Sequence, residues 1–545
     1  MEEATAEVIA VYPDKIRILV KNINKFQTGA EPLAVGSYLK IYDHTDCAII
    51  AIIENFSIEL HEDAKTGVKY KVYIVEAAPL GVIDAEGAFT RGGNQIAIPP
   101  KKVIPASKAD IQKIYDDIEE KSVFCFSKLS QDKSISVPVD GNRFFNKHIA
   151  IVGSTGSGKS HTVAKILQEA IMAKSGGYAG LNNSHIVIFD IHSEYQSAFP
   201  KANYISAANL LLPYWLLNYE ELEDLFIESN EEQSHNQIAI LKKAITDNKQ
   251  LHFKGDEVSK SKIFYDSPVF FNINEVLDVI KIKNEEMVEG AKTGSTKQGP
   301  LFGKLDNFAT RLENKIGDKR LTFLLGDDAR QMKPVDVLTQ FLAYTEKNQA
   351  NITIIDVSGV PFEVLSITVS LISRILFDYA YHTKKKNAKS LNETPLLIVY
   401  EEAHKYVPKG GSAKFNASRF SIERIAKEGR KYGVTLAIVS QRPSEISETI
   451  FSQCSNFIAM RLTNPDDQNY VKKLLPDTLG PLTQSLPILQ AGEALLIGES
   501  SVMPSLVRID PCDPSPSSSD IQYLDEWKKE WLAIDFDPII DAWQK

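Results

Sequence analysis

The chain has 545 residues, of which 43% are hydrophobic and 24% are charged, and its formal net charge is −10. This composition is typical of a soluble globular protein with two to four structural units, and it excludes disorder along the whole length. The negative charge argues against indiscriminate nucleic-acid binding over the whole surface, but a local basic groove needs only a few Lys and Arg. The longest clean apolar run, residues 47–53, is far shorter than the roughly 20 residues of a membrane helix.

The cysteines and the start of the chain indicate a reducing compartment. The four cysteines lie far apart and form no CxxC pattern, so the sequence predicts neither a zinc site nor a disulfide framework. The first residues carry two glutamates and no basic stretch, which argues against a secretory signal. We therefore expect a cytoplasmic protein.

Residues 1–106 have the pattern of a small sheet or barrel. Apolar positions alternate on both sides of a Pro-Asp turn, and further strand-like stretches follow at short intervals. Short strands separated by Gly, Pro, Asp and Asn are typical of small barrels. No catalytic cluster is visible in this domain, so we expect it to serve assembly or partner docking. The predicted strand regions are 8–20, 37–43, 47–53, 69–77 and 94–100.

The pattern then changes to alternating helices and strands. A helix is predicted at 107–121, with Ser107 and Asp110 as capping residues. Apolar strands that alternate with helices predict a parallel sheet covered on both faces. We assign residues 107–200 and 349–509 to this α/β core. Its predicted buried strands are 148–152, 185–190, 351–356, 395–400, 434–440 and 456–462.

Two segments differ from this core. Residues 201–348 are charged and mostly helical in pattern, as in LNYEELEDLFI and FGKLDNFATRLENKI, which predicts an α-helical insertion between two core strands. Within it, residues 287–300 have the composition of a mobile loop. Residues 510–545 form a C-terminal tail, predicted as a Pro/Ser linker at 510–520 and a Trp-rich amphipathic helix at about 521–533.

A phosphate-binding motif follows the first core strand. The pattern G-x-x-x-x-G-K-[ST] is matched at every fixed position, between an apolar strand and a helix. A chance Gly/Ser-rich turn is the alternative, and this context argues against it. Backbone N–H groups of the loop surround phosphates, Lys159 is expected to reach the β- and γ-phosphates of ATP, and Ser160 to hold Mg²⁺. The predicted ATP-binding residues are Gly153, Ser154, Thr155, Gly156, Ser157, Gly158, Lys159, Ser160 and His161.

A second core strand ends in two carboxylates, in the sequence PLLIVYEEAH. At such a strand end, Glu401 is expected to support Mg²⁺ and Glu402 to orient and activate the attacking water. Adjacent side chains on an extended strand point to opposite faces, so we expect the two residues to have different roles. A solvated Glu pair is the alternative, and the upstream phosphate-binding loop makes it the weaker interpretation.

Polar residues near a third strand complete the candidate catalytic set. The strand VTLAIVS is followed by Gln441, which can hydrogen-bond a γ-phosphate or its attacking water, although an ordinary loop start is the alternative. A helix is predicted at about 416–431. Its Arg430, or alternatively Arg424, can act as an arginine finger in the ATP site of a neighbouring subunit. A cation near a helix C-terminus is the ordinary explanation for such residues.

The motifs GSTGSGKS, FDIHSEY, VYEEAH, KEGRKYG and VSQRPS together resemble the HerA family, in the HerA/FtsK group of P-loop ATPases. The resemblance implies an α/β fold: a RecA-like P-loop ATPase core with a parallel sheet, a small N-terminal β-barrel, an α-helical insertion and a C-terminal tail. It also implies a homohexameric ring that hydrolyses ATP between subunits and moves double-stranded DNA through a central pore. The barrel is then expected to recruit a nuclease or another effector.

Residue by residue, the resemblance makes Lys159 and Ser160 the P-loop pair and Glu401 and Glu402 the Walker B pair. Gln441 is then the sensor and Arg430 the finger. The second strand motif departs from the family, which often has Pro and Gly beside its His, whereas residues 191 and 193 are Ile and Ser here. This departure affects the expected geometry of the loop after the second strand, and it does not affect the ATPase assignment.

The same motif also has the spacing of a metal site. If the strand continued through it, Asp190, His192 and Glu194 would lie on one face and could converge on a metal. We favour instead a polar segment that supports the neighbouring nucleotide site.

Three functional hypotheses remain open at this stage. An ATP-driven DNA translocase would need basic pore contacts, for which the loop after Glu402 offers candidates, although a solvated surface loop is nearly as good an explanation. An ATP-binding scaffold would assemble and regulate a partner enzyme, as in HerA-like antiviral systems with a sirtuin-type NADase or a nuclease. A conjugation or secretion ATPase is disfavoured by the lack of a membrane helix. The candidate pore contacts are Lys405, Lys409, Lys414 and Arg419.

Overall fold

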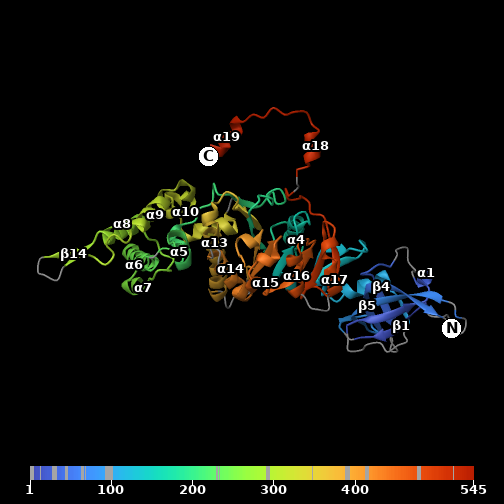
Figure 1. Ribbon diagram of the computed structural model, residues 1–545. Coiled ribbons are helices and arrows are strands. Elements are labelled where there is room, and N and C mark those ends of the chain that lie inside the picture. The colour runs from blue at the N-terminus through green and yellow to red at the C-terminus, as the bar shows by residue number, and fades with distance from the viewer. Residues whose placement is uncertain are drawn as a thin grey trace.

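A computed structural model describes residues 5–544, apart from residues 13, 27–32, 43–46, 63–66, 68, 93–101, 229–230, 232, 290–294, 346–347, 387–392, 411–416, 475–479 and 519–520. The parts of the chain lie in a row (Figure 1). An N-terminal sheet occupies one end, a large sheet flanked by helices the middle, and a group of helices the other end.

The N-terminal sheet is antiparallel, with the strand order β1-β2-β5-β4-β3-β7, and β6 pairs with β5. A bridge between Glu7 and Lys102 brings the two ends of this order together. Inward-facing residues such as Ile18, Ile41 and Val75 form a core of their own. The elements are β1 (Ala6–Val11), β2 (Ile16–Val20), α1 (Ile23–Phe26), β3 (Tyr38–Tyr42), β4 (Ala48–Glu62), β5 (Lys69–Ile83), β6 (Phe89–Arg91) and β7 (Val103–Pro105).

The strands predicted in this region are present where the structure describes them. β4 and β5 extend well beyond the predicted stretches and form a long hairpin. The strand predicted at 94–100 lies outside the described residues.

The central sheet contains every buried strand that the sequence predicted for the core. From β12 to β20 neighbouring strands run parallel, and the strands from β21 to β9 continue the sheet antiparallel. In spatial order the strands are β12 (Asn203–Ile205), β17 (Ile352–Asp356), β11 (His185–Asp190), β18 (Leu396–Tyr400), β19 (Val434–Ser440), β10 (His148–Val152), β20 (Cys454–Met460), β21 (Glu493–Gly498), β22 (Ser505–Ile509), β8 (Val123–Leu129) and β9 (Ser136–Asp140).

Each face of this sheet is buried under its own hydrophobic core. Along β10, Ile149 and Ile151 belong to the core that contains α2 and α4, whereas Ala150 and Val152 face the core that contains α13 and α14. This alternation follows from the two-residue period of a strand and explains the continuous apolar runs in the sequence. The helices of the middle part are α2 (Lys108–Tyr115), α3 (Gly141–Phe145), α4 (Lys159–Met172), α13 (Phe362–Lys386), α14 (Ala417–Glu428), α15 (Glu448–Phe451), α16 (Pro465–Leu474) and α17 (Gly480–Gln484).

Two helix predictions in the core need correction. The helix predicted at 107–121 ends at Tyr115, although its capping box between Ser107 and Asp110 forms as expected. The helix predicted at 416–431 ends at Glu428, and a 3₁₀ turn, Gly429–Tyr432, carries Arg430. α13 is long and apolar enough to cross a membrane by composition, but most of it is buried inside the protein as a core helix.

The predicted insertion is helical, and its apolar residues join the core on one face of the sheet. Its first residues differ from the prediction, because residues 203–205 form β12 at the edge of the central sheet. The described residues of the predicted loop 287–300 include a hairpin of β13 (Met287–Glu289) and β14 (Thr296–Gln298). The other elements are α5 (Tyr219–Phe226), α6 (Ser234–His252), α7 (Glu257–Ser261), α8 (Ile273–Asn284), α9 (Asp306–Gly317), α10 (Thr322–Leu325), α11 (Asp327–Gln331), α12 (Pro334–Leu342), β15 (Tyr344–Thr345) and β16 (Asn348–Gln349).

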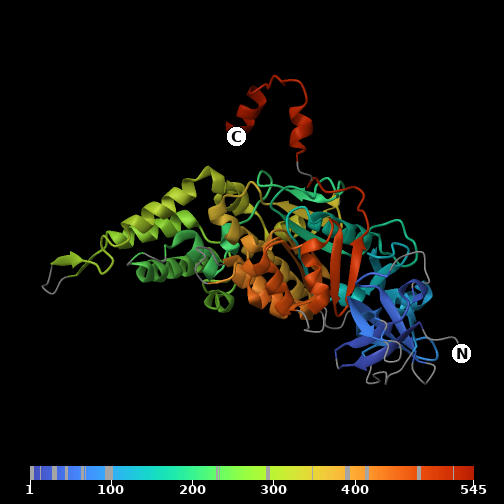
Figure 2. The ribbon, with the colours of Figure 1, turned by 45° about the vertical axis from the view of Figure 1, so that its right-hand side comes forward.

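The C-terminal tail differs most from its prediction. In place of a helix at about 521–533, it forms two short helices, α18 (Tyr523–Trp527) and α19 (Asp537–Gln544). Both stand away from the rest of the chain in two views (Figure 2). Their apolar side chains are consequently uncovered, and Trp531 between them is 98% exposed.

Candidate functional site

The predicted phosphate-binding loop connects β10 to α4, at the edge of the sheet where the parallel strands end. Gly156 and Gly158 have φ angles of 72° and 102°, a region that favours glycine. At Gly153 a Cβ atom would lie 2.5 Å from the Ser157 hydroxyl oxygen. Among the described residues no side chain caps the N-terminus of α4. Its first amides therefore remain available to a bound anion.

A cavity of about 620 Å³ opens beside this loop and gathers most of the predicted site residues. Lys159 lines it and is only 7% exposed. Gly153, Ser154 and Ser157 shape the loop without lining the cavity. The predicted residues on the cavity wall are Thr155, Gly156, Gly158, Lys159, Ser160, His161, Glu401, Glu402 and Gln441.

Both strand-end carboxylates reach this cavity, which differs from the prediction that they point to opposite faces. β18 ends at Tyr400, and Glu402 adopts a left-handed conformation with φ 49°, so the extended geometry does not continue through the pair. A non-glycine residue in this region stores strain, and such residues cluster at functional sites. Glu401 and Glu402 are 2% and 5% exposed.

The two carboxylates have different surroundings. Glu401 accepts a hydrogen bond from the Tyr195 hydroxyl at 2.8 Å. Burial, together with the neighbouring Glu402 carboxylate, raises the pKa of Glu401 to about 8. For Glu402, Oε2 is buried and has no hydrogen-bond partner in the described part of the chain, although His404 Nδ1 approaches to 3.2 Å outside hydrogen-bonding geometry.

Gln441 follows β19 and contacts the phosphate-binding loop directly. Its side-chain oxygen accepts a hydrogen bond from the Thr155 hydroxyl at 2.7 Å. One residue earlier, the carbonyl of Ser440 accepts from the Gly153 amide at 3.2 Å. These contacts fix the end of β19 against the loop and bring the Gln441 amide to the cavity.

The turn after β11 supports the same cavity, and it does not have the geometry of the metal spacing considered above. β11 ends at Asp190, whose carboxylate accepts from the backbone amides of His192 at 3.1 Å and Tyr195 at 2.9 Å. His192 and Glu194 reach the cavity wall, whereas Asp190 holds the turn. Within the described residues no group of His, Cys, Asp and Glu is arranged to hold a metal on its own. The role of Tyr195 was not anticipated, although it belongs to the motif FDIHSEY.

The cavity has the chemistry that a nucleotide and its divalent cation require. Buried acceptor atoms, Glu194 Oε2 and Glu402 Oε2, accept no hydrogen bond in the part of the chain that the structure describes. They share the cavity with the Lys159 ammonium group, the Ser160 hydroxyl and the uncapped end of α4. This combination fits a phosphate chain with Mg²⁺, because Lys159 and the helix amides suit the phosphates, Ser160 and Glu401 supply oxygen ligands, and a buried carboxylate oxygen remains for the attacking water.

The segment predicted as a linker forms part of this site. Residues 510–518 run along the core as a strap, and Asp510, Pro511 and Ser518 line the cavity. The Ser517 amide donates to the Glu194 carbonyl at 3.0 Å. The Gln168 side chain binds the strap in both directions, as a donor to the Pro514 carbonyl at 2.8 Å and as an acceptor from the Asp513 amide at 3.1 Å.

Arg430 lies at the opposite edge of the sheet. It precedes β19, and it lines a separate cavity of about 660 Å³ together with His148, the first residue of β10. In the described part of the chain, Arg430 has no carboxylate within ion-pair distance. Arg424 instead packs its guanidinium over the Phe377 ring, at 5.1 Å from the ring centre. The remaining cations around the Arg430 cavity are Lys147, Lys384, Lys427 and Lys431.

The candidate DNA contacts have unequal surroundings. Lys409 forms an ion pair with Glu448 at 2.7 Å, and Arg419 donates to the Gly410 carbonyl at 2.8 Å. Lys405 is exposed and, within the described residues, has no ion pair. Lys414 lies outside the described residues.

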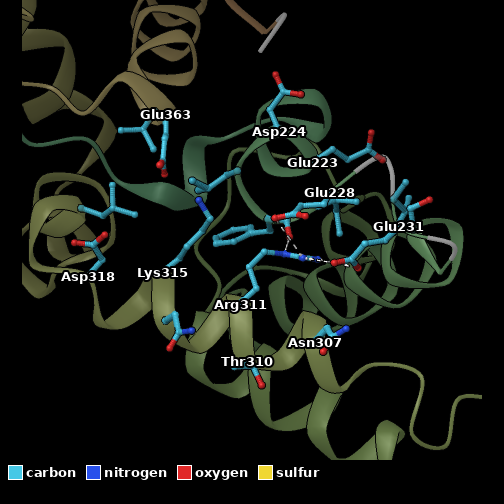
Figure 3. A pocket seen from close by; sticks show the side chains of 18 of the residues that line it. Glu223, Asp224, Glu228, Glu231, Asn307, Thr310, Arg311, Lys315, Asp318 and Glu363 are labelled. Atoms are coloured by element: carbon cyan, nitrogen blue, oxygen red, sulfur yellow. Dashed lines mark hydrogen bonds and ion pairs between the residues drawn. The ribbon is translucent and has the colours of Figure 1, made fainter. Parts of the chain in front are cut away.

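A larger cavity, of about 1000 Å³, lies among the insertion helices and the start of α13 (Figure 3). Carboxylates such as Glu223, Asp224 and Glu363 surround it, and its Arg311 forms an ion pair with Glu231 at 2.6 Å. It contains no residue of the phosphate-binding loop. Its size therefore does not make it the nucleotide site.

The raised pKa of Glu401 predicts a pH-dependent effect on stability. The folded chain keeps the Glu401 proton up to pH about 8, whereas an unfolded chain loses it near about pH 4.3. Wild-type stability is therefore reduced as pH rises through this window. Glu401→Gln has no such titration, so its stability relative to wild type should increase from pH 5 to pH 8, by on the order of 2–4 kcal/mol.

Urea denaturation of the nucleotide-free wild type and Glu401→Gln at pH 5 and pH 8 measures the gap between their free energies of unfolding. Glu445→Gln, which alters an exposed carboxylate, is the matched control and should show a constant gap. A gap for Glu401→Gln that stays equally constant would contradict the protonation assigned to this residue.

The chain is similar to several known proteins. A model of the central domain of HerA helicases matches residues 124–376. VirB4 of Thermoanaerobacter pseudethanolicus, a solved structure, superposes with a TM-score of 0.48 at 15% identity, covering 73% of this chain and 98% of that one. A probable helicase of Methanocaldococcus jannaschii is 25% identical over 80% of this chain and 76% of its own length.

The chain is also similar to the DNA double-strand break repair helicase HerA of Sulfolobus acidocaldarius. The two sequences are 30% identical over 448 residues, which cover 82% of this chain and 79% of that protein. The chain therefore belongs to the HerA helicase family, and it is a P-loop ATPase.

Proposed function

We propose that the chain is the subunit of a homohexameric ring that uses ATP hydrolysis to move double-stranded DNA and works with an effector enzyme. The observation that carries the proposal is the division of the catalytic groups. The phosphate-binding loop and both carboxylates meet at one edge of the sheet, and Arg430, which has no ion pair among the described residues, lies at the other. Such a division suits an ATP site completed by a neighbouring subunit.

Within one subunit the cavity residues have separable roles. Lys159 binds the β- and γ-phosphates, and Gln441 orients the attacking water. Ser160 and Glu401 would hold Mg²⁺, which neutralises phosphate charge. Glu402, whose Oε2 lacks a partner in the described structure, accepts the proton of the attacking water.

The neighbouring subunit supplies the missing cation. Lys159 approaches the phosphates from the loop side, which leaves the outer face of the γ-phosphate without a positive charge. Arg430 of the adjacent subunit stabilises the charge that develops there in the transition state. The exposed apolar residues of the tail, Trp531 among them, favour oligomer formation because they have no covering surface within the described chain.

DNA as the substrate is supported by the relatives, several of which are named DNA double-strand break repair helicases. Lys405 is the candidate contact that best fits this role, because it is exposed and has no ion pair among the described residues. Phosphate contacts of this kind need only a few cations per subunit, since a ring repeats each of them.

The N-terminal domain, which we describe as a small barrel, is proposed to dock the effector, a nuclease or a sirtuin-type NADase, in antiviral defence or DNA end processing. Its β4–β5 hairpin exposes Ile58, Leu60 and Tyr70 to solvent. Exposed apolar side chains grouped on one hairpin are typical of a protein-binding surface.

The proposed function predicts an ATPase activity that duplex DNA stimulates. Lys159→Ala should abolish nucleotide binding, whereas Glu402→Gln should bind ATP and lose at least about 100-fold in turnover, because a carboxamide cannot act as a base. Lys165→Ala, nearly two turns further along α4 and ion-paired to Glu169, is the matched control. ATP hydrolysis with and without linear duplex DNA measures both effects. Unstimulated turnover together with ATP-independent effector binding would favour the scaffold hypothesis instead.

Action of Arg430 in trans predicts rescue in mixed rings. Arg430→Ala should lower the turnover rate far more than the affinity for ATP, because a finger acts mainly on transition-state charge. Rings mixed from Arg430→Ala and Glu402→Gln subunits contain interfaces in which an intact Glu402 faces an intact Arg430. These rings should regain activity that neither variant has alone. A nucleotide-bound oligomer with Arg430 remote from every γ-phosphate would refute the assignment.

Effector docking on the barrel predicts a selective loss of binding. Replacing Ile58 and Leu60 by Asp should abolish co-purification with a nuclease or NADase encoded beside the gene, because charge disfavours burial at an apolar contact. ATP hydrolysis should remain at the wild-type rate. Replacing the exposed Lys21 of the same domain by Asp serves as the control. Full effector binding by the Ile58/Leu60 variant would place docking elsewhere on the chain.

A further inference from the structure

A buried histidine links the strand that leads into the phosphate-binding loop to the segment that carries Arg430. His148 is the first residue of β10, and its side chain is 4% exposed. Its Nε2 lies 2.8 Å from the carbonyl oxygen of Ala426, and its Nδ1 lies 3.0 Å from the backbone nitrogen of Leu436. Both ring nitrogens therefore have backbone partners.

These partners define the protonation state of the ring. A backbone N–H can only donate, so Nδ1 must accept from Leu436. A carbonyl oxygen can only accept, so Nε2 must carry the proton that it donates to Ala426. The neutral imidazole with its proton on Nε2 is the form that satisfies both, whereas a protonated ring would set two donors against each other at Leu436.

The charges around the ring favour this neutral form. Burial lowers the pKa of His148, the hydrogen bond to Ala426 opposes the shift, and Arg430 lowers the pKa further. Lys147, which precedes it in the chain, is ion-paired to Glu499. Lys427 from α14 and Lys384 from α13 line the cavity that Arg430 and His148 share, and Glu393 is the acidic residue on its wall. Cations thus predominate beside the ring and disfavour a charged imidazole.

The two hydrogen bonds hold both ends of the segment that presents Arg430. Ala426 lies in the last turn of α14, where carbonyls lack partners within the helix, and Leu436 lies near the start of β19. Between them the chain makes the 3₁₀ turn with Arg430 and reverses at Gly433, which has φ 76°. This turn is compact, because a Cβ atom at Gly429 would lie 2.9 Å from the Val434 carbonyl oxygen.

We propose that His148 is a positioning residue for the arginine finger. It fixes the position and orientation of the 3₁₀ turn that carries Arg430 relative to β10. That strand continues into the phosphate-binding loop of the same subunit. The inference rests on the proposed role of Arg430 at the neighbouring subunit's ATP. A finger displaced by about 1 Å loses much of its effect on the transition state while ATP binding, which depends on the loop, is unchanged.

Two substitutions separate the two hydrogen bonds. The side-chain oxygen of His148→Asn can replace Nδ1 as the acceptor for Leu436, but its short amide leaves the Ala426 carbonyl without a donor. The side-chain NH₂ of His148→Gln reaches the position of Nε2 and keeps the bond to Ala426. It loses the acceptor for Leu436, but Leu436 belongs to β19, which β10 and β18 hold on both sides. His185→Asn is the matched control, because His185 is the first residue of β11 in the same sheet and its ring hydrogen-bonds only to the Tyr344 hydroxyl and the Asn183 side chain among the described residues.

The experiment measures kcat and KM for ATP, oligomer mass and the thermal unfolding midpoint of the full-length variants. His148→Asn should lower kcat by about 10- to 100-fold with KM and oligomer mass unchanged. His148→Gln should stay within about twofold of wild type, and so should His185→Asn. In the Arg430→Ala background, His148→Asn should cause no further loss, because the residue acts through the arginine.

Several outcomes would overturn the proposal. A further loss of kcat in the Arg430→Ala background would show that His148 acts independently of the finger. An equal loss of kcat in the Asn and Gln variants would show that the hydrogen bond to Ala426, which only the Gln variant keeps, does not determine the rate of ATP hydrolysis. If the Asn variant does not fold, a tenfold loss of kcat in a normally folded Gln variant decides against the proposal. Failure of the proposed finger is a distinct result, in which Arg430→Ala alone hydrolyses ATP at the wild-type rate.

Discussion

The shared direction of the central strands determines where the functional groups of this chain can lie. Because β10, β18 and β19 run in the same direction, their carboxyl ends meet at one edge and their amino ends at the other. The phosphate-binding loop, the two carboxylates and Gln441 follow carboxyl ends, whereas Arg430 precedes an amino end. Strands of five to seven residues separate these edges by roughly 20 Å. No side chain spans such a distance, so Arg430 in its proposed role would have to act on the ATP of a neighbouring subunit.

The nucleotide cavity is organised at a cost to stability. Glu401 is buried and keeps a proton at neutral pH, and Glu402 is held in a left-handed conformation with an unpartnered oxygen in the described structure. Both conditions are unfavourable in the free protein and are relieved by cations and phosphates. Tyr195 and the C-terminal strap hold the cavity from the side of the β11 turn. We infer that ligand binding releases this stored cost and stabilises the fold.

Local sequence patterns predicted those parts of the site whose structure depends on residues that are adjacent in the chain. The loop at 153–160 is recognisable because its glycines, lysine and hydroxyl each have a fixed chemical role. The buried strands of the core were found because a strand covered on both faces is apolar at every position. The strands β8, β9 and β22 were missed, because polar residues interrupt their apolar pattern, although β8 and β9 are close in sequence and only the pairing of β22 with β8 is distant.

The same reasoning explains the errors within the site. The shared cavity of Glu401 and Glu402 depends on where β18 stops, and no residue type marks that point. The strap was predicted as a linker, because Pro and Ser give no sign that backbone hydrogen bonds to Gln168 and Glu194 will hold it. His148 was read as one more residue of an apolar strand, since its two partners lie almost 300 positions away.

We propose that one chain holds an incomplete ATP site. The most direct measurement is the rate of ATP hydrolysis per chain across a dilution series, with the mass of the assembly determined at each concentration. The account predicts that the rate per chain falls in parallel with the loss of assembled rings, while isolated chains still bind ATP. Isolated chains that hydrolyse ATP at the full rate would contradict it.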